Sequence, residues 1–311
     1  MRSIYFVLWV LVGPVGAEEV PSPARPQVVA LGGQAYAFIG DMDVPNRKNR
    51  GLICNSAFIV TPSGVVVVDP GGSRQIGESL LREIRRRTPQ PIRYVINTHH
   101  HADHWMGNDA FARLKPRPVI IGHASMRATA QAIGPEWLRI IGRLTGGANR
   151  GTEVVLPTRS VSADEALTLG DTQLRLIAFD HAHTQGDLAV FWPAQRLLIT
   201  GDVLFYRRTP GWQDADPLGN AAALERLLRL DPKTVVPGHG PVTDANGIRW
   251  MLDYIALLKR EVQRHMDAGL TDYEMKDKIE VGSYRTMSGF EQRFGMNVNK
   301  MYLQLESQAF Q

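Results

Sequence analysis

Short runs of apolar residues, separated by polar turns, predict strands and helices in the first half of the chain. Val65 to Val68 form a run of four valines, as expected for a central strand that is covered on both faces. Amphipathic spacing predicts a helix at 75–87 and a second at 125–144, interrupted near Gly134 and Pro135. The predicted strands of this half are residues 34–39, 52–60, 65–69, 93–97 and 119–121.

The second half of the chain repeats this order of strands followed by helices. Thr271 and Glu274 have the spacing of a capping box, which predicts the start of a further helix. This order favours an α/β fold built as a four-layer αββα sandwich with mixed sheets and a C-terminal helical extension, although order alone leaves a doubly wound sheet open. The predicted elements are strands at 173–179, 188–192, 196–199 and 234–236, and helices at 220–230 and 251–266.

The first residues have the layout of a secretory signal peptide. Arg2 precedes an apolar run at 4–12, and small residues at 15–17 offer a cleavage site after Ala17. The run is shorter than the roughly 20 residues that span a bilayer, so no transmembrane segment is expected after cleavage. We therefore expect a periplasmic or secreted protein. Its parts are a signal peptide at 1–17, a linker at 18–29 and one domain at 30–311, with a helical part at 247–311.

Composition narrows the class of protein. Hydrophobic residues make up 44% of the chain, enough for a sizeable core. The 35 Lys and Arg residues against 31 Asp and Glu residues give too small a surplus to indicate a nucleic-acid partner. Cys54 is the one cysteine of the sequence and lies in a predicted strand. This excludes an internal disulfide and predicts a buried, unreactive thiol.

Candidate chemistry is concentrated directly after the predicted strand at 93–97. His99, His101, Asp103 and His104 occupy four of six consecutive positions at the end of this strand. His99 and His101 are two residues apart, so in an extended segment they point to the same side. Imidazole and carboxylate groups suit Zn²⁺, Mn²⁺ or Fe²⁺. The segment predicts a metal site, with His100 turned away from the ligands.

Three later segments carry further ligand candidates. His181 and His183 lie between two predicted strands, and Asp202 follows an apolar strand. His239 lies between two glycines, which allow the backbone to approach a metal closely. Taken alone, Asp202 also fits the N-cap of a helix.

The four motifs H-x-H-x-D-H, H-T-x-G, G-D and G-H-G, in this order and spacing, resemble the metallo-β-lactamase superfamily of di-metal hydrolases. The resemblance extends from about Ala30 to Val242. It favours His183 over His181, because Thr184 and Gly186 complete the second motif. It implies two Zn²⁺ ions per chain, with Fe or Mn as alternatives, one held by His99, His101 and His183, the other by Asp103, His104 and His239, and both bridged by Asp202.

The flanking residues indicate a branch of this superfamily. Asn55, residues 70–73, 104–108 and 151–157 are similar to the exported SoxH-like quinoprotein-relay zinc metallohydrolases, and the ligand set is like that of glyoxalase II. The resemblance implies a metal-bridging hydroxide that attacks the activated carbonyl of a small-molecule thioester, ester or lactone. Asp103 would be both a metal ligand and the catalytic residue that orients the nucleophile.

Three different functions stay open beside acyl hydrolysis. The zinc β-lactamases resemble the sequence less, because their best known class has Cys at the position of Asp202, so β-lactam hydrolysis ranks below acyl hydrolysis. Persulfide dioxygenases of the same superfamily hold one iron through residues that match His99, His183 and Asp202. The third is the role of a non-catalytic metal-binding partner of a periplasmic quinoprotein system.

Residues around the expected site mouth suggest substrate contacts. Trp105, Tyr206 and Trp212 are candidate pocket residues. Arg47 and Arg50 lie in a polar loop expected beside the metal ions, and a cationic rim there would attract an anionic substrate. Lys48, Arg207 and Arg208 would extend this rim.

Overall fold

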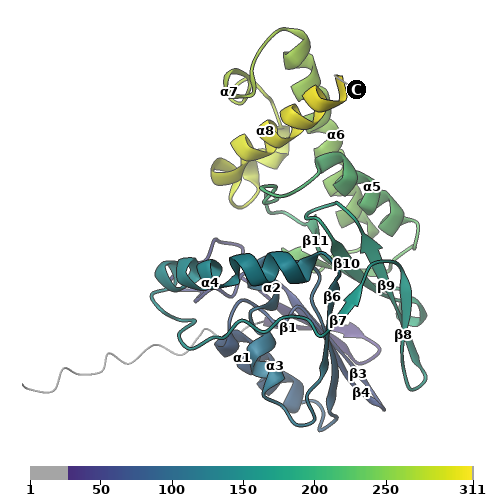
Figure 1. Cartoon of the computed structure of the whole chain (residues 1–311). Coiled ribbons are helices and arrows are strands. Elements are labelled where there is room, and N and C mark those ends of the chain that lie inside the picture. The colour runs from purple at the N-terminus through teal and green to yellow at the C-terminus, as the bar shows by residue number, and fades with distance from the viewer. Residues whose placement is uncertain (1–26, 310–311) are drawn as a thin grey trace, which may run out of the picture.

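Two β-sheets pack face to face, and helices cover the outer face of each sheet (Figure 1). The computed structural model describes residues 27–309, so the predicted signal peptide and most of the predicted linker lie outside the described residues. The first sheet has the strand order β1-β2-β3-β4-β5-β6-β7. Its strands are β1 (Gln27–Gly32), β2 (Ala35–Ile39), β3 (Ser56–Thr61), β4 (Gly64–Val68), β5 (Ile92–Ile96), β6 (Val119–His123) and β7 (Arg159–Val161).

The second sheet has the strand order β12-β11-β10-β9-β8. Both sheets are mixed: β1 to β4 pair antiparallel and β4 to β7 parallel, while in the second sheet β11 and β12 form the parallel pair. The strands are β8 (Glu165–Leu169), β9 (Thr172–Phe179), β10 (Asp187–Trp192), β11 (Leu197–Phe205) and β12 (Thr234–His239).

The helices fall into two sets, one for each sheet. The first set is α1 (Arg74–Arg85), α2 (Ala102–Trp105), α3 (Asn108–Ala112) and α4 (Met126–Leu144), and the second is α5 (Pro217–Leu228), α6 (Ala245–Asp267), α7 (Asp272–Met275) and α8 (Phe290–Ala309). Two 3₁₀ turns, η1 (Pro193–Gln195) and η2 (Gly282–Thr286), complete the described elements. No helix among residues 27–309 is both long and apolar enough to cross a membrane.

Three apolar clusters hold these layers together. Between the sheets, side chains such as Ile59 and Val68 of the first sheet share a buried cluster with Leu188 and Ile199 of the second. Alternate residues of the same strands face outward, so Phe58 and Val67 pack beneath α1 and α3. The third cluster joins the second sheet to α5, α6 and α8. The predicted four-layer αββα sandwich is therefore confirmed.

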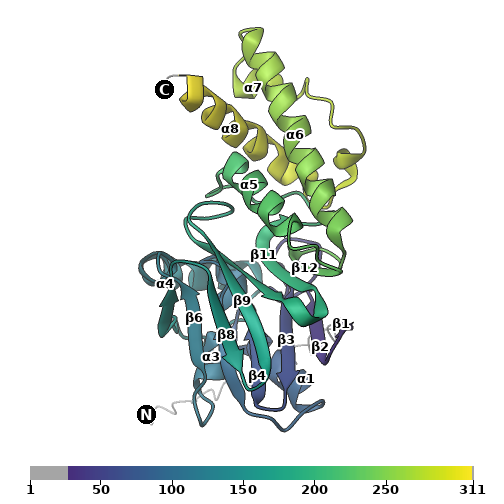
Figure 2. The same ribbon diagram turned by 90° about the vertical axis from the view of Figure 1, so that its right-hand side faces the viewer.

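The C-terminal helices project beyond one end of the sandwich (Figure 2). In both views α6, α7 and α8 form a helical lobe. Within this lobe, α6 packs against the second sheet. Asp244 caps α6, and the predicted capping box of Thr271 and Glu274 is present at α7. The lobe stands over the end of the sandwich at which β5, β11 and β12 finish.

Some elements differ from the sequence prediction. The predicted interruption of the helix at 125–144 is wrong, because α4 continues through Pro135. Pro135 removes one backbone donor, and the helix is held by close packing of Gly134 against Trp105 and Val154. β1 was not predicted and begins at Gln27, inside the segment expected to be a linker. α6 begins at Ala245, six residues before the predicted start.

Candidate metal centre

Four candidate ligands come from the turn that follows β5. The chain leaves this strand through Asn97 and Thr98, and His99 and His101 extend from the turn. One turn of helix, α2, then begins with His101 at its N-cap and carries Asp103 and His104. The predicted cluster is therefore local: a strand end and one helical turn direct four side chains toward the second sheet.

The other three candidate ligands come from the second sheet. His183 lies in the loop between β9 and β10, and His239 is the last residue of β12. Asp202 lies within β11, rather than after it as predicted, because the strand continues to Phe205. The pairing of β11 with β12 shifts register at Gly201, which has a φ of 53°. This irregularity turns Asp202 toward the histidines.

Glycine is required opposite Asp202. A Cβ atom on Gly238 would lie 1.9 Å from Asp202 Oδ1, so any larger residue would collide with the carboxylate. The side-chain amide of Asn55 donates to the carbonyl oxygens of Pro237 at 2.8 Å and Gly240 at 2.7 Å. These two bonds connect Asn55, which directly precedes the β3 strand of the first sheet, to the segment that contains His239.

The first group of candidate ligands consists of His99, His101, His183 and Asp202, whose ligand atoms lie within 4.8 Å of one another. His183 Nε2 lies 2.9 Å from His101 Nδ1 and 3.3 Å from Asp202 Oδ2. His99 Nε2 lies 3.8 Å from Asp202 Oδ2. All four residues are buried.

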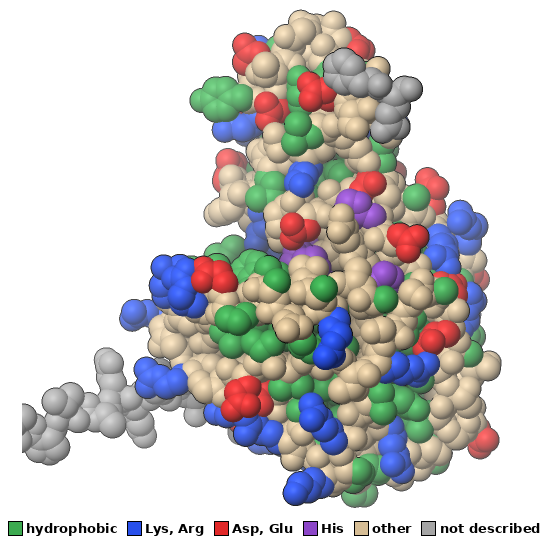
Figure 3. All heavy atoms as spheres, viewed as in Figure 1, with side chains coloured by type: hydrophobic (Ala, Val, Ile, Leu, Met, Phe, Trp, Pro, Cys, Tyr) green, Lys and Arg blue, Asp and Glu red, His purple; other side chains and the backbone are tan. Residues whose placement is uncertain are grey.

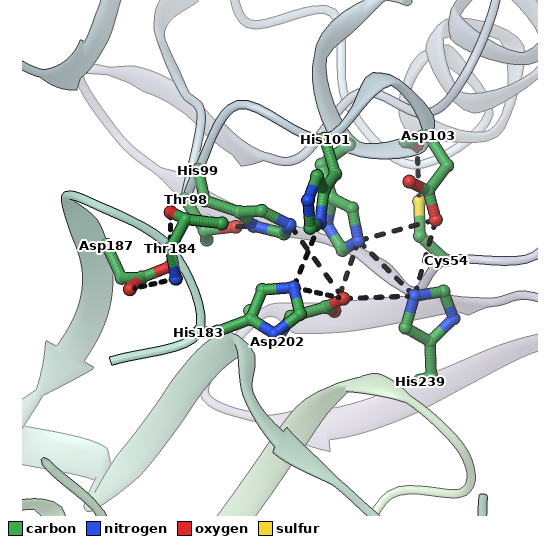
Figure 4. Close-up of polar contacts among 12 residues, drawn as sticks. Cys54, Thr98, His99, His101, Asp103, His183, Thr184, Asp187, Asp202 and His239 are labelled. Atoms are coloured by element: carbon green, nitrogen blue, oxygen red, sulfur yellow. Dashed lines mark hydrogen bonds and ion pairs between the residues drawn. The ribbon is translucent and has the colours of Figure 1, made fainter. Parts of the chain in front are cut away.

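The second group consists of Asp103, His104 and His239. His239 Nε2 lies 3.4 Å from His104 Nε2 and 3.3 Å from Asp103 Oδ2. Asp202 also reaches this group, since its Oδ1 lies 3.1 Å from His104 Nε2 and its Oδ2 lies 3.3 Å from His239 Nε2. Figure 4 shows the Asp202 carboxylate between the rings of His183 and His239. The structure thus brings all seven predicted ligands together, with Asp202 in contact with both groups.

The hydrogen bonds of the imidazole rings test whether these residues fit a metal. His104 Nδ1 lies 2.8 Å from Asp69 Oδ2, and His239 Nδ1 lies 2.8 Å from the carbonyl oxygen of Ile53. Each acceptor fixes the proton on the outer nitrogen, so the inner nitrogen presents a lone pair. The hydroxyl oxygen of Thr98 likewise accepts from Nδ1 of His99. The buried Nε2 of His99 has no hydrogen-bond partner.

His101 completes this pattern with the opposite nitrogen. Its Nε2 lies 2.8 Å from Asp214 Oδ2, which leaves Nδ1 facing His183. Hydrogen bonds from His100 and His101 lower the pKa of Asp214, so this carboxylate stays ionised as an acceptor. Burial lowers the pKa of His99 and of His183, so both rings are neutral at pH 7, and their inner lone pairs repel those of neighbouring ligands unless a cation lies between them. The residues therefore fit metal ions bound by nitrogen and oxygen ligands.

The two additional histidines lie outside these groups. His181 is exposed, and its Nε2 lies 3.1 Å from the carbonyl oxygen of Asp214. His100 is buried and its Nε2 lies 3.8 Å from the Asp214 carboxylate, on the outer side of His101. The preference for His183 over His181 therefore agrees with the geometry. Figure 3 shows histidine side chains at the surface where the helical lobe meets the sandwich.

A cavity of about 160 Å³ opens over the two groups of ligands. His101, Asp103, His183, Asp202 and His239 form its floor. Its walls combine apolar residues with polar residues from the helical lobe and from the loop after β11, namely Pro45, Ile53, Trp137, Ile141, Phe205, Arg208, Gln213 and Arg293.

Five residues predicted to contact the substrate do not line this cavity, namely Trp105, Tyr206, Trp212, Arg47 and Arg50. Trp105 and Trp212 are fully buried, Trp105 with its indole N–H donating to the carbonyl oxygen of His100. Tyr206 packs edge-on against Trp250. Arg47 lies beside Gly146, and Arg50 borders a separate cavity near α1.

Sequence reasoning missed several residues of the site. Asp69 ends the predicted strand at 65–69, and a carboxylate at a strand end beside the histidine segment was a usable signal. Asp214 and Gln213 lie in a loop without a recognisable motif. Arg293 lies on α8, and nothing in its surrounding sequence indicates that it reaches the cavity. Arg208 was predicted as part of the cationic rim and does line the cavity.

Residues 49–239 match the sequence profile of the metallo-β-lactamase superfamily. Because this match covers more than half of the chain, the protein belongs to that superfamily. With its two groups of candidate metal ligands, it is a metal-dependent hydrolase.

The relatives act on different substrates. A linear primary-alkylsulfatase of Pseudomonas sp. is 23% identical over 263 residues, which cover 72% of this chain and 49% of the alkylsulfatase. A hydroxyacylglutathione hydrolase of Rhodobacter capsulatus is 28% identical over 156 residues, covering 50% of this chain and 51% of that enzyme. This chain thus spans about half the length of either relative.

Among solved structures, a stereoselective inverting sec-alkylsulfatase from Pseudomonas sp. superposes with a TM-score of 0.67 at 18% identity. The match covers 89% of this chain and 50% of the alkylsulfatase. At this identity the likeness establishes the fold.

Proposed function

We propose that this protein uses two zinc ions to hydrolyse an activated acyl bond in a thioester, ester or lactone. The observation that carries the proposal is the position of Asp202, whose two carboxylate oxygens contact both groups of candidate ligands beneath one cavity. A carboxylate in this position can hold two metal ions close together. When bound, such ions lower the pKa of a shared water molecule and polarise the carbonyl oxygen of the substrate.

Asp103 is the residue best placed to orient the attacking water. Its side chain retains 17% exposure and lines the cavity, whereas His104 beside it is fully buried. A carboxylate at the cavity floor accepts a hydrogen bond from water and so directs the oxygen lone pair toward the carbonyl carbon. The backbone carbonyl oxygen of Asp103 accepts a hydrogen bond from the buried Cys54 thiol at 2.8 Å, and this contact helps to hold the turn in place.

The apolar wall suits the acyl part of such a substrate. Trp137 and Ile141 of α4 and Phe205 of β11 line the cavity. They exclude water from the space above the ligands and can contact a short apolar chain. The relationship to hydroxyacylglutathione hydrolase, whose name describes the hydrolysis of an acylglutathione, supports the acyl class.

Turnover and metal analysis of the purified protein test this proposal together. We expect hydrolysis of at least one thioester, ester or lactone, loss of activity on chelation, and recovery when two equivalents of Zn²⁺ are restored. Asp103→Asn should reduce kcat by about 100-fold. Full activity in the metal-free protein would overturn the proposal, and so would turnover of β-lactams alone.

Hydrolysis of a sulfate ester is the second candidate. The likeness to the sec-alkylsulfatase covers 89% of this chain, more than the span of the superfamily match, and so includes much of the helical lobe. 4-Nitrophenyl sulfate assayed beside 4-nitrophenyl esters separates the two candidates.

An iron-dependent oxygenase and a non-catalytic metal-binding protein would each give different measurements. A mononuclear-iron persulfide dioxygenase would contain one iron and consume O₂, whereas Asp103, His104 and His239 provide a second group of ligands. A non-catalytic partner of a periplasmic quinoprotein system would bind metal without turnover of any substrate in the screen. Metal stoichiometry, O₂ uptake and turnover distinguish both from the proposed hydrolase.

We also propose that the protein is exported with loss of residues 1–17, on the basis of Arg2, the apolar run and the small residues before Glu18. Mass spectrometry of the protein from the periplasm and the medium should show an N-terminus at Glu18. A chain that begins at Met1 in the cytoplasm would contradict this.

A further inference from the structure

Two arginine side chains enter the cavity over the metal centre from the side of the helical lobe. Arg208 lies in the loop after β11, and Arg293 lies in the first turn of α8. They are 85 positions apart in the sequence, by subtraction of their numbers. Neither guanidinium is within 4.0 Å of a carboxylate oxygen among residues 27–309.

Arg208 is held rigidly. It is 1% exposed, and its Nη2 donates to the carbonyl oxygen of Asp43 at 3.2 Å. Its Nη1 lies beside the Nδ1 of His239, which donates to the carbonyl oxygen of Ile53. The Nε of Arg208 has no hydrogen-bond partner. A guanidinium that is almost completely buried and has one donor without an acceptor is costly to fold into this position.

Arg293 has the same deficiency. Its Nη1 is inaccessible to solvent and also lacks a hydrogen-bond partner. The backbone that precedes α8 is tied to the Arg208 loop, because Thr209 N–H donates to the carbonyl oxygen of Ser288 at 3.0 Å and Ser288 N–H donates to that of Arg207 at 3.2 Å. These bonds fix the two arginines relative to one another.

The two positive charges therefore share one cavity without a carboxylate of the described residues within 4.0 Å. The acidic groups that act on both at longer range are Asp43 and the candidate ligands Asp103 and Asp202. A guanidinium group stays protonated in proteins, so both side chains carry a positive charge at neutral pH. An anion in the cavity would relieve the repulsion between the two guanidinium groups.

We propose that Arg208 and Arg293 bind an oxyanion of the substrate, a carboxylate or a sulfate group, while its apolar part contacts Trp137 and Ile141. This inference rests on the proposed function, because it names the substrate class of the same site. It replaces the predicted rim of Arg47, Lys48 and Arg50, which do not line the cavity. The substrate is therefore a small amphipathic anion.

The oxyanion can belong to either of two kinds of substrate, an acyl substrate with a carboxylate or a sulfate ester. A carboxylate distant from the scissile bond belongs to an acyl substrate such as a glutarate monoester. A sulfate would itself be the group that is cleaved from an alkyl or aryl sulfate. Both present oxygen atoms in a geometry that guanidinium groups bind through paired hydrogen bonds.

The test compares Arg293→Gln with Arg207→Gln in the metal-loaded protein. Arg207 is the exposed neighbour of Arg208 and does not line the cavity, so this control removes the same charge nearby. Three substrates share one leaving group, 4-nitrophenol: the glutarate monoester, the neutral pentanoate ester and the sulfate. We expect Arg293→Gln to raise KM for the anionic substrate that is turned over by about 10- to 100-fold, and to raise KM for the pentanoate by much less. Arg293→Lys should recover part of this loss.

Calorimetric titration with inorganic sulfate gives a readout that does not need turnover. Wild type and Arg207→Gln should bind sulfate equally, and Arg293→Gln should bind it at least about tenfold more weakly at equal metal content. If no substrate is hydrolysed but sulfate binding depends on Arg293, the proposed function fails and the oxyanion site stands. Equal sulfate affinity in Arg293→Gln and wild type, or no sulfate binding in wild type, overturns the oxyanion site. Equal losses for pentanoate and glutarate monoester also overturn it, because they indicate a structural role for Arg293.

Discussion

The Nδ1 atom of His104 lies 2.8 Å from Oδ2 of Asp69, and this pair is fully buried at the junction of the two sheets. The same carboxylate accepts hydrogen bonds from the backbone N–H of Thr98 at 2.8 Å and from its hydroxyl group at 2.7 Å. Asp69 thus orients His104 directly and supports His99 through Thr98. One residue that is not a ligand fixes one candidate ligand in each group.

Asp69→Asn should weaken metal binding while the fold remains intact. Asp69 has a φ of 52°, a conformation that asparagine tolerates, so the substitution mainly removes the charge that orients His104. We expect the affinity for the second metal equivalent to fall by about 10- to 100-fold, measured by competition with a chromophoric chelator. Asp231→Asn is the matched control, since Asp231 has the same φ of 52° on the surface. Equal effects of the two substitutions would contradict the orienting role.

Asp202→Ala should remove the contact between the two ligand groups. Because Asp202 lies within 3.3 Å of histidine nitrogens from both groups, its loss should lower the metal content below two equivalents and reduce kcat/KM by more than about 100-fold. Elemental analysis and circular dichroism measure metal content and fold on the same samples. Two tightly bound metal ions and full activity in this variant would exclude the bridging role.

His183→Ala and His181→Ala form a natural pair of test and control. His183 is buried among the candidate ligands, whereas His181 is exposed and its Nε2 lies 3.1 Å from the carbonyl oxygen of Asp214. We expect His183→Ala to lose one equivalent of metal and about 100-fold or more in activity, and His181→Ala to change either by less than about threefold. The reverse order in metal titrations would show that the other histidine is the ligand.

Sequence reasoning picked out the candidate ligands that the structure brings together, because they lie in short motifs at strand ends, where local spacing determines direction. His99 and His101 illustrate this, since alternation in an extended segment predicted their shared orientation. The cavity wall could not be predicted in this way. Arg293 reaches the cavity only because the start of α8 lies at the end of the sandwich that carries the candidate ligands, and that contact depends on packing between segments far apart in the sequence. The continuation of β11 beyond Gly201 was not predicted. Gly201 has a positive φ, and the strand register shifts at this residue.

Asp187 should make the stability of the protein depend on pH. Burial raises its pKa to about 7, although hydrogen bonds from the N–H and hydroxyl of Thr184 oppose the shift. The folded state therefore binds this proton more tightly than the unfolded state. The stabilisation is present at low pH and is lost as pH rises through about 7, by at most about 4 kcal/mol.

Asp187→Asn should remove this dependence, because the amide stays neutral and its oxygen can still accept from Thr184. The measurement is the free energy of unfolding of both proteins at pH 5 and pH 8. The variant should gain more stability relative to wild type at pH 8 than at pH 5. A constant difference between the two proteins would indicate that Asp187 does not titrate in this range.

The candidate ligands are divided between the two sheets: His99, His101, Asp103 and His104 follow β5, whereas His183, Asp202 and His239 belong to the second sheet. With a single cysteine the chain has no internal covalent cross-link, so bound metal would act as a clasp between the halves of the sandwich. Separation of the halves would then require release of the ions. At a free metal concentration a thousandfold above Kd, this linkage adds about 4 kcal/mol to the free energy of unfolding. The activity of the protein and its stability toward unfolding would therefore both depend on the concentration of free metal.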